Sequence, residues 1–104
     1  MGYRSEIAIA IDPIVYENAP VDVKEAFQEI WDNPDIEEAE RIVFHHDFIK
    51  WYDSDPVVAT INNWLGALDE TEYGLIELGE DMSDVRMEGE YFNYGLDFVR
   101  KIDF

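Results

Sequence analysis

Two adjacent histidines, His45 and His46, are the residues of this 104-residue chain whose chemistry stands out first. Histidine is a general base, a metal ligand and a group that titrates near neutral pH. Adjacent side chains of a strand point to opposite faces, so the two imidazoles do not readily share one metal ion. Asp47 lies on the side of His45 and can pair with it. We therefore expect a packed His46 and an exposed His45 with an acidic neighbour.

An acid–base hydrolase that uses His45 or His46 with a carboxylate is one alternative. Such an enzyme needs a nucleophile or an activated water beside the histidine, and no motif in the sequence signals either. The chain contains no cysteine, which excludes disulfides, thiolate chemistry and zinc–thiolate sites. We therefore predict a protein that is not an enzyme and has no catalytic residue, no metal and no cofactor.

The acidic turn 79–84, flanked by Glu77 and Glu88, is a further candidate for chemistry. Carboxylates are the preferred ligands of calcium and magnesium, but this turn lacks the Asp-x-Asp-x-Asp-Gly spacing of a calcium loop. The two flanking acids are also expected on separate strands. A pair of carboxylates of this kind serves glycosidases as well, but we predict only adventitious cation binding here.

The charge of the chain is its most unusual bulk property, because 25 acidic residues stand against 7 lysines and arginines. A net charge of −18 argues against direct binding to nucleic acid or anionic lipid, which need a basic surface. Two explanations stay open, namely solubility or salt adaptation, and a surface that imitates nucleic acid to attract a basic groove. The stretch from Trp51 to Val85 contains no lysine, arginine or histidine, which favours the second.

We predict that acidic residues of this stretch and of the strand after it bind a basic, nucleic-acid-handling partner protein. Alternate residues of a strand lie about 6.5–7 Å apart, close to the spacing of neighbouring phosphates along one nucleic-acid strand. Affinity for such a partner should fall steeply with salt. The predicted partner-binding residues are Glu70, Glu72, Glu77, Glu80, Asp81, Asp84, Glu88 and Glu90.

The alternative function, from a different class, is the binding of a small ligand or nucleotide, so that the protein acts as a sponge that sequesters this ligand. Its pocket would be built from Arg4, His46, Trp51 and nearby aromatic residues. Nucleotide retained by the purified protein would favour this alternative over the partner-binding one.

The apolar pattern predicts a single α+β domain over residues 1–104, with the order β-α-β-α-β-β-β. Hydrophobic residues make up 47% of the chain, which indicates a folded core. Two helices should pack on one face of a mainly antiparallel sheet. No apolar run approaches the roughly 18 residues of a membrane span, and the first residues lack the basic start of a signal peptide. We therefore expect a cytoplasmic protein.

The first strand is expected over 3–11, where large and small apolar residues alternate. The small residues would let a helix approach closely on their face. A connection over 14–19 should follow, with Asn18 as a candidate cap for a helix that begins at Pro20 or Val21. The alternating residues are Ile7, Ile9 and Ile11 on one face and Ala8 and Ala10 on the other.

The second helix has the clearest start, because Ser54 or Asp55 can cap it and Pro56 suits its first position. β-Branched and aromatic residues before it favour a strand. The last third of the chain is expected to form three consecutive strands as an antiparallel meander. The strands predicted after the first helix cover 41–52, 73–78, 84–92 and 96–104.

Three segments of the chain resemble a group of small tailed-bacteriophage proteins of largely uncharacterised role. They are Tyr3-Arg4-Ser5-Glu6 before an alternating strand, Ile49-Lys50-Trp51-Tyr52 with a proline soon after, and Leu78-Gly79-Glu80-Asp81 with Asp84 before a glycine-containing strand. The resemblance implies an early, host-directed phage protein rather than a part of the virion. Together with the acidity, it implies an inhibitor of a host defence enzyme such as a restriction or CRISPR nuclease, acting in the host cytosol. The oligomeric state stays open.

Overall fold

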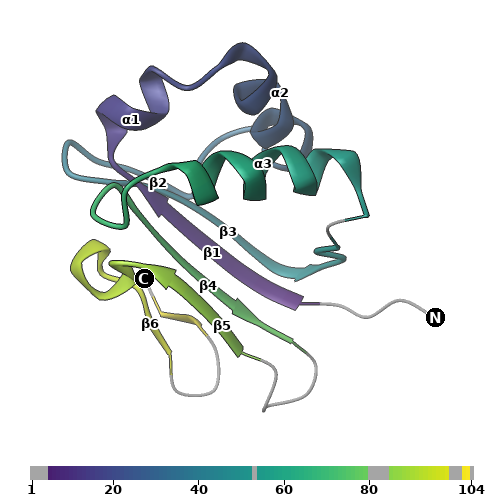
Figure 1. The fold of residues 1–104 in the computed structure, drawn as a ribbon. Helices are drawn as coiled ribbons and strands as arrows, with labels where there is room; N and C mark the ends of the chain where they lie inside the picture. Colours follow the sequence, from purple (N-terminus) through teal and green to yellow (C-terminus); the bar gives the residue numbers. More distant parts are fainter. Residues whose placement is uncertain (1–4, 53, 80–84, 99–101, 104) are drawn as a thin grey trace.

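The strand β1 (Ser5–Ile11) is the central strand of the sheet in the computed structural model of this chain (Figure 1). Residues 7–11 of this strand are completely buried, because both of its faces are covered. The sheet has five strands in the order β2-β3-β1-β4-β5, and each neighbouring pair is antiparallel. The structure describes residues 5–52, 54–79, 85–98 and 102–103.

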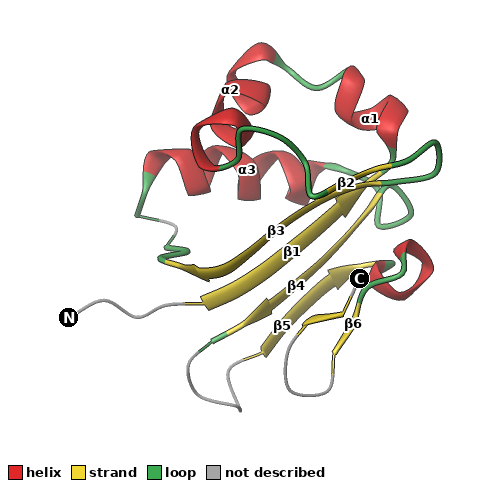
Figure 2. Cartoon of the chain, turned by 180° about the vertical axis from the view of Figure 1, so that it is seen from behind, coloured by secondary structure: helices red, strands yellow, loops and turns green. Residues whose placement is uncertain are grey.

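Helices and strands mix along the chain in an α+β arrangement, which confirms the predicted fold class. The α-helices lie together on one side of the sheet, as predicted (Figure 2). After β1 the elements are α1 (Pro13–Glu17), α2 (Val21–Ile30), β2 (Ile36–Glu37), β3 (Ile42–Ile49), α3 (Pro56–Ala67), β4 (Tyr73–Leu78), β5 (Val85–Gly89), the 3-10 helix η1 (Tyr91–Tyr94), β6 (Asp97–Phe98) and β7 (Ile102–Asp103).

The short helix α1 occupies the segment that the sequence analysis treated as a connection, so the described residues contain three α-helices rather than two. Asp12 caps α1, because its side chain accepts a hydrogen bond from the Ile14 N–H at 2.9 Å, and Pro13 takes the first helical position. Asn18 ends this helix instead of capping α2, whose N-cap is Pro20. The proposed role of Asn18 was therefore wrong.

The larger core lies between the sheet and the helices, on the isoleucine face of β1. Ile7, Ile9 and Ile11 pack there against Phe27 of α2 and Ile61 of α3. We had expected a helix to approach the alanine face, but the α-helices cover the isoleucine face and the alanine face meets the short 3-10 helix η1 instead. The large side chains of β1 fill the space under the helices, and burial of such side chains contributes about 1.5–3 kcal/mol each.

A smaller core covers the alanine face of β1. Ala8 and Ala10 pack there with Leu96, and Tyr91 and Tyr94 of η1 lie against the same cluster. Helix η1 contacts β4 and β1, and β7 contacts β1. The small alanine side chains therefore accommodate the end of the chain, which lies on this face of the sheet.

The predicted meander of three final strands is only half correct. Strands β4 and β5 form an antiparallel pair, but η1 follows them where residues 91 and 92 were expected to extend the strand. Strands β6 and β7 then pair with each other in a separate two-stranded sheet. Gly95 ends η1 in the left-handed conformation with φ 78°, which glycine adopts without strain.

Helix α3 begins as predicted. The Asp55 side chain accepts a hydrogen bond from the Val57 N–H at 2.9 Å, and Pro56 takes the first helical position. Val58, Ile61 and Leu65 form its buried face. Across the described part of the chain, no helix combines the length and the apolar character needed to cross a bilayer.

Candidate functional site

A cavity of about 500 Å³ opens between α1, α2 and the β2–β3 hairpin. We call it the acidic groove, because aromatic and apolar residues form its floor and carboxylates stand along its rim. The floor residues are Tyr16, Trp31, Ile42 and Phe44, the rim acids are Glu17, Asp32, Glu37 and Glu38, and Lys24 and Gln28 complete the wall on α2.

Three rings hold each other in place on the floor of the groove. The ring centroids of Tyr16 and Phe44 are 5.4 Å apart, and those of Trp31 and Phe44 are 5.3 Å apart. The Trp31 indole N–H donates a hydrogen bond to the His45 carbonyl oxygen at 2.8 Å, which fixes the indole against β3. Burial raises the pKa of the Tyr16 phenol, so the ring is neutral at physiological pH. Trp31 and Phe44 are buried core residues, so the half-buried Tyr16 is the ring of this uncharged floor that is most open to a ligand.

Local structure explains how the groove residues come together. The last intrahelical bond of α2 joins the Trp31 N–H to the Phe27 carbonyl at 2.8 Å, and Trp31 itself is already extended. The chain then turns at Asn33-Pro34 and returns as the short strand β2 beside β3. This turn carries Asp32 and Glu37 to the rim above the aromatic floor.

The rim is strongly negative. Its four carboxylates are all exposed, whereas Lys24 is the one cation among the described residues that line the groove, and it donates to the Glu17 carbonyl oxygen. Glu38 forms an ion pair with Arg41 at 2.8 Å. Among the described residues, no ion pair is found for Glu17, Asp32 or Glu37. These three carboxylates therefore give the groove a net negative potential.

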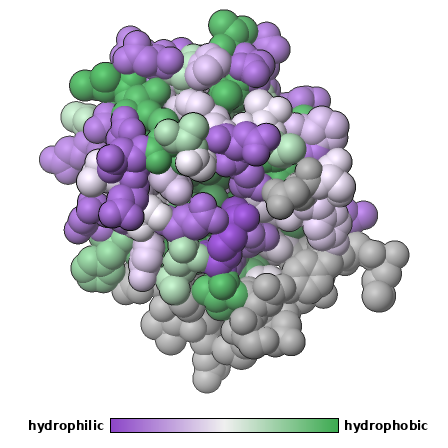
Figure 3. Space-filling model, in the orientation of Figure 1, coloured by the Kyte–Doolittle hydropathy of each residue, from purple (hydrophilic) through white to green (hydrophobic). Residues whose placement is uncertain are grey.

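The acidity extends beyond the groove along the segment 22–40. This segment has eight acidic residues, all exposed, and its only basic residue is Lys24. Hydrophilic side chains cover much of the helical part of the molecule (Figure 3). The acids outside the groove rim are Asp22, Glu25, Glu29, Asp35 and Glu40.

The acids that the sequence analysis selected do not form one uniform surface. Glu77 and Glu88 lie on β4 and β5 on either side of Arg86, whose Nε is 3.4 Å and 3.2 Å from their carboxylates. Burial, and then the Glu88 charge, raise the pKa of the neighbouring Tyr73 phenol. Arg86 therefore offsets part of the negative charge of this strand pair.

Of the other selected acids, Glu70 and Glu72 lie in the loop before β4 and Glu90 follows β5. Glu70 is exposed, whereas the Glu72 carboxylate accepts a hydrogen bond from the Asp69 N–H at 2.8 Å. Glu90 accepts one from the Asn93 side-chain amide at 2.9 Å. Glu80, Asp81 and Asp84 lie outside the described residues.

The alternative pocket around Arg4, His46 and Trp51 has less support. Arg4 lies outside the described residues. Trp51 is a core residue that is 6% exposed, with its ring centroid 6.2 Å from that of Trp31. The indole N–H of Trp51 has no hydrogen-bond partner within the described ranges. The groove described above is formed by other residues.

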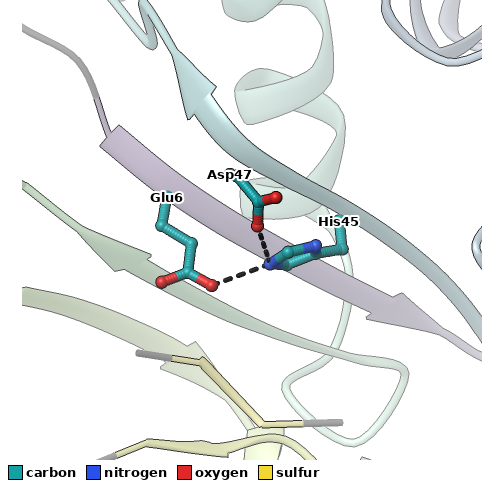
Figure 4. A group of neighbouring side chains, drawn as sticks. All are labelled: Glu6, His45 and Asp47. Atoms are coloured by element: carbon teal, nitrogen blue, oxygen red, sulfur yellow. Dashed lines mark hydrogen bonds and ion pairs between the residues drawn. The ribbon is translucent and has the colours of Figure 1, made fainter. Parts of the chain in front are cut away.

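The expected exposure of His45 was wrong, although its expected acidic neighbour was correct. The His45 side chain is only 13% exposed, and its Nε2 lies 2.8 Å from Glu6 Oε2 and 3.4 Å from Asp47 Oδ1 (Figure 4). Glu6 could not be expected beside His45 from the sequence, because β1 and β3 are far apart along the chain. His46 lies opposite Ile7 in the strand register, on the other face of the sheet from His45.

No known protein family, curated protein or solved structure matches this chain. The resemblance to phage proteins stays a prediction.

Proposed function

We propose that this chain binds a basic partner protein through the acidic groove and the acidic segment 22–40 around it. The observation that supports the proposal best is the combination of an aromatic floor with a rim of exposed carboxylates in one cavity. An arginine or lysine side chain has the matching structure, because its stem is apolar and its head is cationic. The groove then recognises basic side chains, and the surrounding acids attract the partner.

Arginine suits the groove better than lysine. A planar guanidinium stacks on aromatic faces and forms paired hydrogen bonds with carboxylates, whereas an ammonium does neither as well. The cavity volume of about 500 Å³ lies in the range of small-molecule sites and admits one or two such side chains. Glu37 and Asp32 are the carboxylates that we assign to the guanidinium.

The class of partner follows from the charge. A surface with this density of carboxylates steers cationic proteins to it, and the association rate falls as salt screens the charges. Proteins that handle nucleic acid present basic grooves of this kind, so we propose such a protein, with a host defence nuclease as the case suggested by the phage resemblance. Blocking that groove makes the chain an inhibitor that imitates nucleic acid.

The groove is the primary contact in this proposal, and the acids first selected from the sequence are a secondary one. Glu70 and Glu90 add negative charge on another part of the molecule, while Arg86 offsets that of Glu77 and Glu88. The two surfaces can be tested separately, since they share no residue.

Two charge-reversal variants of equal size test the proposal. The groove variant carries Glu17→Lys, Asp32→Lys and Glu37→Lys, and the control variant carries Glu70→Lys, Glu88→Lys and Glu90→Lys. Titration calorimetry with an arginine-rich peptide, at low and high salt, measures the affinity of each. We expect the groove variant to weaken binding at least tenfold, which is about 1.4 kcal/mol, and the control variant to weaken it much less.

Equal weakening by both variants would show that only net charge matters and would contradict a specific groove. Capture from a host lysate with the same two variants extends the test to the natural partner. A basic protein that the wild type and the control variant retain, that the groove variant does not, and that high salt releases is the expected result.

A further inference from the structure

In contrast to the sequence-based prediction of no metal, we propose that Glu6, His45 and Asp47 form a binding site for a divalent first-row transition-metal ion of the Zn²⁺ type. This site lies apart from the acidic groove and does not depend on the function proposed above. Both carboxylates converge on the same atom, His45 Nε2, from two neighbouring strands (Figure 4). The three ligand atoms all lie within 4.8 Å of one another.

The distances suit one metal ion. Tetrahedral Zn²⁺ has bonds of about 2.0–2.1 Å to nitrogen and oxygen, which places its ligand atoms roughly 3.3 Å apart. The contacts of 2.8 Å and 3.4 Å in the cluster lie on either side of that separation. The three ligand atoms lie within 4.8 Å of one another, so binding requires the Glu6 and Asp47 carboxylates to turn toward a common ion beside His45 Nε2.

The backbone holds the histidine firmly. The His45 N–H donates to Asp35 Oδ2 at 2.6 Å, and the His45 carbonyl accepts the Trp31 indole N–H at 2.8 Å. The register of β3 against β1 shifts between Ser5 and Ile7, beside Glu6, as in a β-bulge, and bulges redirect side chains near functional sites. The strand pair therefore presents the three side chains together without help from a flexible loop.

Burial also favours a bound ion over a cluster of solvated acids. The side chains of Glu6 and His45 are 14% and 13% exposed, whereas Asp47 is 85% exposed. Two ligands thus sit in a partly dehydrated position where an ion is bound more strongly, and the third lies at the solvent side, where an ion enters. The negative charge of the whole chain raises the local concentration of cations.

The ligand set selects the class of ion. Imidazole with carboxylates suits zinc and its transition-metal neighbours, while magnesium and calcium prefer oxygen ligands alone. The competing explanation is a protonated His45 held by two carboxylates, with no metal. Added Zn²⁺ distinguishes the metal site from this ion-paired arrangement, because it shifts the ring ¹⁵N signals of His45 only if it binds there.

The test is a titration of ¹⁵N-labelled protein with ZnCl₂, followed by the histidine ring ¹⁵N signals. The chain has only two histidines, so His46, on the opposite face of β3, is an internal control. We expect Zn²⁺ to shift the ring signals of His45 and to saturate at one equivalent, with His46 unchanged. MgCl₂ should shift neither ring.

Asp47→Asn and His46→Gln are the paired variants. Asp47 is almost fully exposed, so its substitution removes one ligand without disturbing the core, and it should weaken Zn²⁺ binding at least tenfold. His46→Gln should leave the affinity unchanged. No shift of the His45 ring at a large excess of Zn²⁺ overturns the proposal in favour of the ion-paired histidinium. An unchanged affinity in Asp47→Asn overturns the three-ligand site.

Discussion

At the scale of single residues, Phe27 is the side chain around which the aromatic core is arranged. Its ring centroid lies 4.6 Å from that of Phe44 and 5.4 Å from that of Tyr16, and both rings belong to the floor of the acidic groove. Trp64 of α3 approaches it edge-on at 6.0 Å. Phe27 thus supports the groove floor from below and joins α2 to α3.

Replacing Phe27 with alanine should therefore destabilise the folded protein strongly. The side chain is fully buried, and Phe→Ala changes in cores cost about 3–5 kcal/mol because they leave a cavity. Phe92→Ala is the matched control, since Phe92 is 71% exposed and its loss should change the free energy of unfolding by less than about 0.5 kcal/mol. Urea unfolding of both variants measures the difference, and similar losses of stability would contradict the core as described.

Several residue-level features could be predicted from the sequence because they depend on local chemistry. The alternation of large and small apolar residues marked the strand β1, and the Asp55-Pro56 pair marked the start of α3. The surroundings of His45 could not be predicted, because Glu6 reaches it from a strand 39 residues away in the sequence. Nor did anything in the sequence signal that Asp32 and Glu37 would meet over an aromatic floor.

At the scale of elements, the contact between β4 and η1 depends on a glycine. A Cβ at Gly74 would lie 2.3 Å from the Tyr91 Cα and 2.8 Å from its nitrogen, so the backbone of η1 must move to admit any side chain. Tyr91 packs on the smaller core, next to the alanine face of β1. Close approach at this position is what attaches the end of the chain to the sheet.

Two Gly→Ala variants test this contact. Gly74→Ala should destabilise the protein by about 1–3 kcal/mol, because overpacking against backbone forces a shift. Gly66→Ala, in α3, meets nothing within 4 Å and should raise stability by up to about 1 kcal/mol through helix propensity. Thermal unfolding of both variants shows whether each substitution lowers or raises the stability. A neutral Gly74→Ala would mean that η1 does not pack against β4 as described.

Elements with strong local sequence patterns were predicted correctly, whereas those that depend on tertiary contacts were not. β4 and the start of α3 have such patterns, and both lie where the sequence predicted them. The segment after residue 90 has an alternating pattern typical of a strand, but tertiary contact with Gly74 makes it η1 and a separate hairpin. The alanine face was misassigned for the same reason, because alternation reveals two faces without showing which one the helices cover.

At the scale of the whole molecule, the net charge of −18 is distributed unevenly. The stretch 51–85, which has no basic residue, is the acidic region that the sequence pattern indicates. The fold instead presents eight exposed acids on the segment 22–40, and Arg86 from outside the stretch neutralises part of the strand surface. The acids of the segment 22–40 can be counted from the sequence, but their position around a cavity with an aromatic floor depends on the topology.

The most direct test of the acidic groove is to map where a basic ligand binds. A ¹⁵N–¹H titration of the whole chain with an arginine-rich peptide reports every backbone amide and the three tryptophan indoles at once. We expect the largest and saturable shifts at Lys24, Gln28 and residues 31–38, and only small ones at residues 70–79 and 85–90. Shifts centred on β4 and β5, or small shifts spread evenly over all acidic surfaces, would contradict the groove as the site of recognition.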